Sequence, residues 1–146
     1  MTASPATRPV DEPPPPKPGP VPGPESGPYW EAVRRRELVL PVCLTCGHCW
    51  LPPTARCPAC LEEDLEWRPV NGRGRVFSFT VFRRAYHPAY RAELPYVVAL
   101  VELEEGPRLV SNIVGCPPEE VVCDLPVRLT FEQRGEDVLP QFTPAG

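Results

Sequence analysis

The chain has 146 residues, 24 prolines and a formal net charge of −4. Its length suits one ordinary domain with an appendage. The acidic balance argues against nucleic-acid binding, because domains of that kind are usually basic over the surface that binds. No segment approaches the roughly 20 apolar residues of a membrane span. We therefore expect a soluble, cytoplasmic protein.

Residues 1–27 predict an extended, disordered arm or linker. Eleven of the 24 prolines lie in residues 1–28, which contain almost no large apolar side chains. This composition favours a solvated chain that is partly polyproline II. We interpret the arm as a semi-rigid spacer, and a docking peptide for a proline-binding domain is the alternative. We expect its removal to leave the melting temperature nearly unchanged.

A short helix is expected next, over Tyr29 to Glu37. Pro28 suits its first turn, and Tyr29, Trp30 and Val33 form an apolar stripe. The triplet Arg34 to Arg36 lies near the C-terminal end, where cations complement the helix dipole. An anchor for a phosphate or an acidic partner is the alternative interpretation of this triplet.

Two C-x-x-C pairs, Cys43/Cys46 and Cys57/Cys60, stand ten residues apart. This spacing predicts a structural zinc ribbon, in which each pair forms a knuckle that points two sulfurs at one ion. Gly47 suits the tight turn of the first knuckle. Four protein ligands leave no open position, so the metal should stabilise the fold and perform no chemistry. Iron fits the same four sulfurs.

Other interpretations of the cysteines are weaker. Disulfides need an oxidising compartment, and residues 1–10 show no charged region followed by an apolar run. A redox C-x-x-C motif normally occurs once, near a βαβ pattern. His48 and Cys49 are expected in solvent or behind the ligands. Cys116 and Cys123 stand among valines and leucines, and we expect both to be small buried side chains.

Strands make up most of the remaining chain. Three short strands are expected around the metal, at residues 38–40, 49–51 and 65–68. Five longer strands follow, at 75–83, 95–103, 108–114, 126–133 and 138–143, with a helical turn at 117–120. This order predicts a five-stranded Greek-key barrel of the OB type. The fold is thus expected to be mainly β, with helix and ribbon over residues 28–69 and barrel over 70–146.

The alternation of side chains assigns faces to two of these strands. In the first barrel strand, Phe77, Phe79 and Val81 share one face, while Val76, Ser78, Thr80 and Phe82 share the other. The second barrel strand is almost continuously apolar, which predicts that both of its faces are covered.

Several motifs follow the expected helix in a fixed order. They are Cys43-x-x-Cys46-Gly47, Pro52-Pro53, Cys57-Pro58-x-Cys60, Leu65-Glu66-Trp67 and the segments 72–81, 95–101 and 106–109. This order resembles the acyl-CoA-associated zinc-ribbon/OB-fold family, formerly a domain of unknown function, over about residues 28–144. The resemblance implies a non-catalytic subunit that accompanies a thiolase-superfamily enzyme, such as a thiolase or a thiolase-like aldolase of steroid side-chain degradation.

The histidines and arginines are candidate contacts for a partner protein or an acyl-CoA, and they form no catalytic arrangement. The sequence indicates no Ser-His-Asp or Cys-His arrangement that would include His48 or His87. The loop at 86–90 is either a surface aromatic cluster or a lining for a partner's acyl-CoA channel. Arginines beside it match the phosphates of CoA or are solubilising edge charges. The candidate contacts are Tyr29, Trp30, Arg73, Arg75, Arg83, Arg84, Tyr86, His87 and Tyr90.

Two other functions are weighed against the accessory subunit. A single-strand nucleic-acid binder would stack bases on Phe77, Phe79 and Phe82. A small electron carrier would hold iron in the four-cysteine site and would be coloured. The excess of acidic over basic residues disfavours nucleic-acid binding, so we prefer the accessory subunit.

Overall fold

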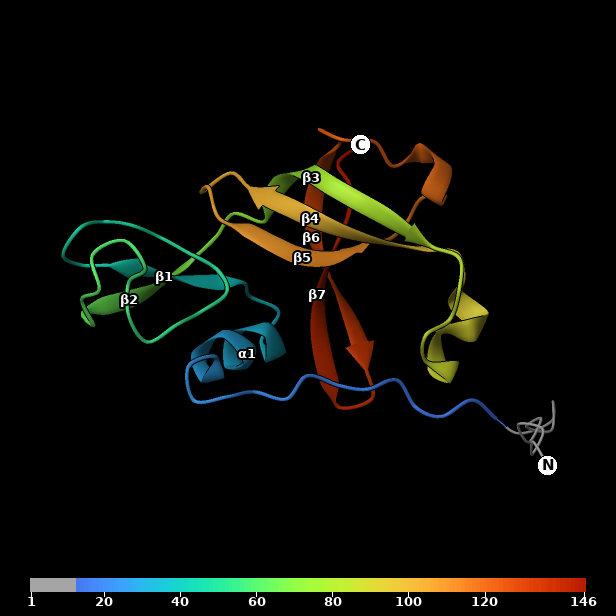
Figure 1. Ribbon diagram of the computed structural model, residues 1–146, viewed down its shortest axis with the longest axis horizontal. Helices are drawn as coiled ribbons and strands as arrows, with labels where there is room; N and C mark the ends of the chain where they lie inside the picture. Colours follow the sequence, from blue (N-terminus) through green and yellow to red (C-terminus); the bar gives the residue numbers. More distant parts are fainter. Residues whose placement is uncertain (1–12) are drawn as a thin grey trace, which may run out of the picture.

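The computed structural model describes residues 13–146. Figure 1 shows a small two-stranded ribbon on one side, a closed barrel on the other, and one helix beneath their junction. Residues 13–26 lead into this helix without a strand or helix of their own, apart from a turn. Over the described residues, each helix is too short or too polar to cross a membrane.

Helix α1 (Gly27–Arg34) is shorter at its C-terminal end than expected. Arg36 takes a left-handed φ of 60°. Its N–H donates to Val33 O at 2.8 Å, and the N–H of Glu37 donates to Ala32 O at 2.9 Å. This pair of bonds is a Schellman closure, which satisfies the last carbonyls and ends the helix. Two of the three arginines therefore lie beyond the helix.

The ribbon consists of β1 (Val39–Cys43) and β2 (Leu65–Pro69), which pair antiparallel. The expected third strand at 49–51 is wrong, because only an isolated bridge joins Val42 and Cys49. Pro41 explains the interruption. Its carbonyl accepts from Trp50 N at 3.4 Å, but proline has no N–H to return, so the ladder stops there.

The expected five-stranded barrel is confirmed. Its strands are β3 (Arg73–Phe82), β4 (Tyr96–Leu103), β5 (Arg108–Ile113), β6 (Pro126–Arg134) and β7 (Asp137–Pro144). They close in the order β3-β4-β5-β7-β6. Short 3-10 helices follow β3 and β5, namely η1 (Pro88–Glu93) and η2 (Pro118–Glu120).

One apolar core joins the ribbon, α1 and the barrel. It combines Val33 of α1 and Leu40 of β1 with barrel residues such as Val101 and Phe142. Phe142 and Val101 are both fully buried. The division at residue 70 therefore separates two folds that share one hydrophobic interior.

The faces of β3 differ from the alternation expected. A β-bulge between Val76 and Ser78 shifts the register against β4. Val76 is buried and Phe79 packs against the core, whereas Phe77 is 41% exposed. The extra residue puts two outward residues in succession, which reverses the phase of all that follow. Phe77 therefore does not share a face with Phe79 and Val81.

Two further expectations about burial are corrected. In β4, buried and half-buried residues alternate, so only one face is fully covered. This is the pattern of an antiparallel strand in a small barrel whose outer face is partly solvated. Cys116 is half-buried and Cys123 is exposed. Cys123 precedes Asp124, whose positive φ of 67° marks a surface turn, and Val121 is the buried residue of this segment.

The arm also differs from expectation. Residues 1–12 lie outside the described part of the chain, so only residues 13–27 can be compared. Residues 13–23 form no helix, strand or turn, residues 24–26 form a turn, and Gly27 begins α1. The segment before α1 runs along that helix and past the β6–β7 hairpin toward η1 (Figure 1). The side chain of Lys17 is only 23% exposed, so the arm packs at this point.

Candidate metal centre and partner-facing surface

The two knuckles bring their sulfurs to one point. The four Sγ atoms of Cys43, Cys46, Cys57 and Cys60 all lie within 4.8 Å of one another. The Cys43–Cys60 and Cys46–Cys57 Sγ distances are 3.5 and 3.6 Å. A tetrahedral ZnS₄ site with Zn–S bonds of about 2.3 Å has S–S edges of about 3.8 Å, whereas a disulfide needs about 2.05 Å. The donor set therefore fits a tetrahedral metal and not two disulfides.

Backbone hydrogen bonds hold each knuckle. Gly47 N donates to Cys43 O at 2.9 Å, and Leu61 N donates to Cys57 O at 2.8 Å. Each turn closes with a left-handed residue, Gly47 at φ 78° and Leu61 at φ 66°. The two pairs thus reach the metal through the same local geometry.

The surroundings of the cysteine sulfurs give the Cys43 and Cys60 thiols different pKa values. Backbone N–H groups, led by that of Cys46, lower the pKa of the Cys43 thiol to about 6. For Cys60, the N–H of Glu62 lowers the pKa, but burial and the neighbouring sulfurs outweigh it and raise the pKa to about 12. Metal ligation requires thiolates, so binding must release protons and must weaken in acid.

The residues between the knuckles do not ligate. His48 is exposed and stacks on Trp50, with ring centroids 6.1 Å apart. Cys49 Sγ donates to Glu105 O at 3.4 Å. Trp50 is buried against Cys43 and Cys57. Its indole therefore shields the metal site from one side.

The aromatic loop after β3 is a continuous cluster. Ring centroids lie 5.9 Å apart between Phe82 and Tyr86, 5.1 Å between Phe82 and Tyr96, 5.7 Å between Tyr90 and Tyr96, and 6.0 Å between His87 and Tyr90. His87 Nδ1 accepts from Ala89 N at 3.1 Å and so caps η1. Tyr86 is 77% exposed. The structure therefore brings three candidate contacts together and leaves one ring free on the surface.

The four candidate arginines do not form one site. Ten-residue β3 separates Arg73 and Arg75 from Arg83 and Arg84, a span of about 30 Å. Arg75 is bound to Glu102 and Asp124 at 2.8 and 2.9 Å. Arg83 and Arg84 are exposed beside the aromatic loop, and Arg84 lies 5.7 Å from the Tyr86 ring centroid.

Tyr29 is only 5% exposed and belongs to the core, so it is not a free surface contact. Burial raises the pKa of its phenol far above the usual range. Trp30 remains half-buried, with its ring edge-on to Tyr29 at 5.0 Å. An alanine substitution at Tyr29 would mainly remove core packing, whereas one at Trp30 would change the groove surface and a smaller part of the core packing.

A groove that the sequence did not indicate extends from Trp30 across the barrel. It has a volume of about 740 Å³ and is mostly apolar. Its lining includes Trp30, Pro52 and Pro53, together with Tyr90 and Arg134, which come from η1 and β6. Residues of β5 and β7, such as Ser111 and Pro140, also line it. Val110 of β5 also lines the groove. It is an apolar side chain at an outward position of the strand and is 69% exposed.

The proposed base-stacking surface is not formed. Phe79 packs inward, while Phe77 lies under Arg108, whose guanidinium carbon is 3.6 Å from the ring centroid. Phe82 belongs to the aromatic loop cluster. The three phenylalanines thus have different environments, which removes the structural basis of the nucleic-acid alternative.

Fold and site together define a zinc-ribbon/OB-fold protein. Residues 30–66 match the family described as "ChsH2, rubredoxin-like zinc ribbon domain". Residues 67–132 match "ChsH2, C-terminal OB-fold domain". A "DUF35 domain-containing scaffold protein" of Methanocaldococcus jannaschii is 33% identical over 110 residues, which cover 74% of this chain and 77% of that protein. The chain belongs to the DUF35 family, and its four-cysteine site is a zinc ribbon.

Other relatives carry more specific names. A "Probable enoyl-CoA hydratase alpha subunit" of Thermomonospora curvata is 42% identical over 80% of this chain. The match spans only 36% of that relative, so the chain corresponds to about a third of its length. "Benzoylsuccinyl-CoA thiolase subunit BbsA" of Thauera aromatica is 30% identical over 60% of this chain and 58% of its own.

A solved structure supports the same assignment. A chain of the "Ltp2-ChsH2(DUF35) aldolase" superposes with a TM-score of 0.81 at 38% identity. The superposition covers 87% of this chain and 99% of that chain. The likeness therefore includes both the ribbon and the barrel.

Proposed function

We propose that this chain is a non-catalytic, zinc-stabilised accessory subunit of a thiolase-superfamily enzyme that acts on acyl-CoA thioesters. The observation that carries the proposal is its likeness to the DUF35 chain of an aldolase over nearly the whole of that chain. A relative named as a thiolase subunit supports the same class of partner. Acyl-CoA in steroid side-chain or lipid catabolism is the substrate class we favour, since the relatives' names include a steroid-type carboxyl-CoA hydratase subunit.

The chemistry of the described residues suits a supporting role. Four cysteines occupy every position of a tetrahedral ion, so the metal has no site for a substrate. His48 stacks on Trp50 and His87 caps η1, and neither is paired with a nucleophile. Within residues 13–146, no arrangement of nucleophile and base resembles a catalytic pair. We place the protein in the cytoplasm, where thiolates are kept reduced.

The groove and the aromatic loop are the surface we assign to the partner. Protein interfaces concentrate aromatic residues and arginine around an apolar centre. Trp30 and Val110 supply apolar area in the groove, and Tyr86 supplies an exposed ring. Arg83 and Arg84, which are exposed beside Tyr86, are the arginines we assign to phosphates of a CoA thioester held in a shared site.

Co-expression tests the proposal. The chain is expressed with each thiolase-superfamily protein encoded near its gene, and the products are separated by size-exclusion chromatography. We expect one stable complex, no acyl-CoA turnover by this chain alone, and higher activity of the partner in the complex. If no such protein co-elutes and none gains activity, the accessory role is wrong.

Surface variants locate the interface. Trp30→Ala, Tyr86→Ala, His87→Ala and Tyr90→Ala should each weaken the complex while the barrel stays folded. Val122→Ala is the matched control, because Val122 is an exposed apolar residue, 54% exposed, outside the groove. Equal association of all five variants with the partner would move the interface elsewhere.

A further inference from the structure

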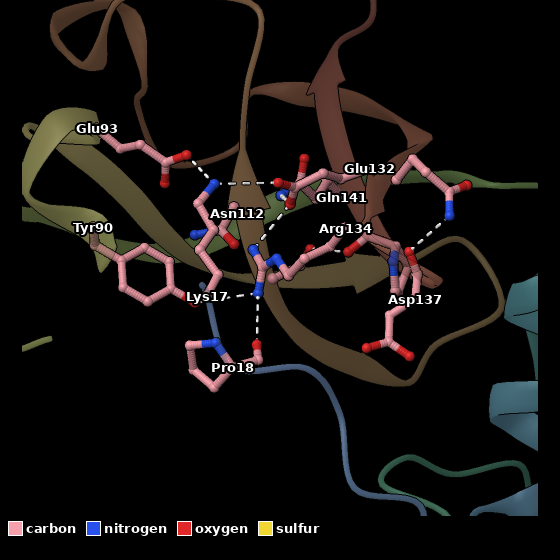
Figure 2. Close-up of polar contacts among 12 residues, drawn as sticks. Lys17, Pro18, Tyr90, Glu93, Asn112, Glu132, Arg134, Asp137 and Gln141 are labelled. Atoms are coloured by element: carbon pink, nitrogen blue, oxygen red, sulfur yellow. Dashed lines mark hydrogen bonds and ion pairs between the residues drawn. The ribbon is translucent and has the colours of Figure 1, made fainter. Parts of the chain in front are cut away.

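The proline-rich arm makes specific contacts with the barrel. Lys17 Nζ bonds to Glu93 Oε1 of η1 and lies 3.4 Å from Glu132 Oε1 of β6. The same Nζ lies 5.8 Å from the ring centroid of Tyr90. Figure 2 shows the lysine reaching between the two carboxylates, with Tyr90 beside its stem. One side chain of the arm thus joins two elements far apart in sequence.

Arg134 adds a second anchor. Its Nη1 donates to Pro18 O at 3.2 Å and to Tyr90 OH at 3.1 Å, and its Nη2 donates to Glu132 Oε2 at 3.0 Å (Figure 2). The Arg134 side chain is 15% exposed and that of Glu132 is 25% exposed. Gln141 Nε2 of β7 also donates to Glu132 Oε2 at 2.8 Å. Contacts within the barrel therefore help to position the carboxylate and the guanidinium that the arm meets.

The composition of the arm suits such docking. Lys17 is the one basic residue in residues 13–26, and it stands between Pro16 and Pro18. Prolines hold the backbone extended before binding, so docking costs little conformational entropy. Two carboxylates from different elements repel each other, and a lysine between them relieves that repulsion. A single anchor can therefore hold a segment that has almost no apolar surface.

The position of the anchor links the arm to the groove. Tyr90, Glu93, Glu132 and Arg134 also line an open cleft of about 380 Å³ that lies beside the anchor. Tyr90 and Arg134 also line the apolar groove that runs to Trp30. The contacts of Lys17 with Tyr90 and of Pro18 with Arg134 therefore hold two side chains of the groove in place.

We propose that Tyr90, Glu93, Glu132 and Arg134 form a binding site for a lysine–proline segment, and that the chain's own residues 17–19 dock there as a strap. The strap ties η1 to the β6–β7 hairpin and orders the Tyr90 end of the groove. It also fixes where the chain reaches the barrel, because the start of the described arm lies on the η1 side, away from the zinc ribbon (Figure 1). The strap is a property of the isolated chain, so it stands or falls independently of the proposed partner enzyme.

Backbone NMR relaxation of the full-length, zinc-loaded chain tests the strap. We expect rigid order parameters of about 0.8 at the amides of Lys17 and Gly19, and flexible values below about 0.6 in Lys17→Glu. Lys17→Arg is the matched control and should keep the strap docked, because it retains the charge. In Lys17→Glu, hydrogen exchange at the Tyr90 amide should become roughly five-fold faster.

Two further measurements test the carboxylates and the charge of the anchor directly. Glu93→Gln with Glu132→Gln should release the strap as Lys17→Glu does, while amide shifts of the ribbon stay unchanged. Salt at about 1 M should also release it, since the Debye length then falls to about 3 Å. Flexible amides at Lys17 and Gly19 in the wild-type chain at low salt would overturn the proposal. Unchanged relaxation in Lys17→Glu would overturn it equally.

Discussion

Leu61 holds in the second zinc knuckle the place that Gly47 holds in the first. Each directly follows the second cysteine of its pair, and each has a positive φ, 66° for Leu61 and 78° for Gly47. Each also donates its N–H to the carbonyl of the first cysteine. The knuckle geometry therefore requires a left-handed residue, and in the second knuckle a leucine adopts that conformation at a steric cost.

Replacing Leu61 by glycine should stabilise the protein. The side chain is 66% exposed, so little packing is lost, while relief of the left-handed strain contributes about 0.5–1 kcal/mol. Denaturant unfolding of the zinc-loaded protein measures the change. Leu44→Gly is the control, because Leu44 is 50% exposed but is not among the positive-φ residues. It should lose stability, and a loss in Leu61→Gly as well would contradict the argument.

Removal of zinc should unfold the ribbon. Structural zinc contributes about 10–16 kcal/mol of binding free energy that is coupled to folding. Cys43→Ser and Cys60→Ser should therefore lose the metal and yield insoluble or unfolded chains, and a strong chelator should act likewise on the wild type. Cys123→Ser should keep both metal and fold, because Cys123 is exposed and outside the ligand set. Elemental analysis that finds neither zinc nor iron in soluble wild-type protein would contradict this prediction.

Gly74→Ala should be strongly destabilising. A Cβ at Gly74 would lie 2.6 Å from the backbone oxygen of Glu102 and 3.0 Å from Val101 Cγ1. Because the nearest atom is backbone of the neighbouring strand, β3 and β4 would have to separate, at a cost of about 1–3 kcal/mol. Gly23→Ala is the control, since nothing lies within 4 Å of its Cβ position. Thermal unfolding compares the two, and equal melting temperatures would refute the close approach.

Glu102 should add a pH-dependent contribution to stability. Hydrogen bonds from Arg75 at 2.8 Å and from Arg108 at 3.0 Å lower the pKa of its carboxyl group. A lowered folded-state pKa stabilises the protein above the unfolded value of about 4.3, and this stabilisation is lost as pH falls through the folded value. The difference in unfolding free energy between wild type and Glu102→Gln should therefore shrink as the pH is lowered. The zinc site contributes equally to both proteins and cancels, and a difference that is constant with pH would contradict the assignment.

Local sequence was sufficient for the metal site and for the class of fold. The spacing of Cys43 to Cys60 encodes two knuckles, because each C-x-x-C pair closes its turn with its own backbone. The barrel strands follow from alternation of apolar residues, as in β6, where Val127, Leu129 and Phe131 point toward the core. Both features depend on residues that are close together in the chain, so they can be predicted from the sequence alone.

Features that depend on partners distant in the chain were decided only by the tertiary structure. The bulge at Val76 arises from pairing with β4 and reverses the faces that alternation predicts for β3. The sequence predicts Tyr29 as a contact on a short helix, but packing against the barrel buries it. Glu93 and Glu132 carry no distinguishing signal in the sequence, and only the approach of η1 to β6 makes them an acceptor for Lys17. In each case the deciding contact joins residues that are far apart in the chain. The pattern of apolar residues along the sequence does not reveal such contacts, because they form only when the elements pack together.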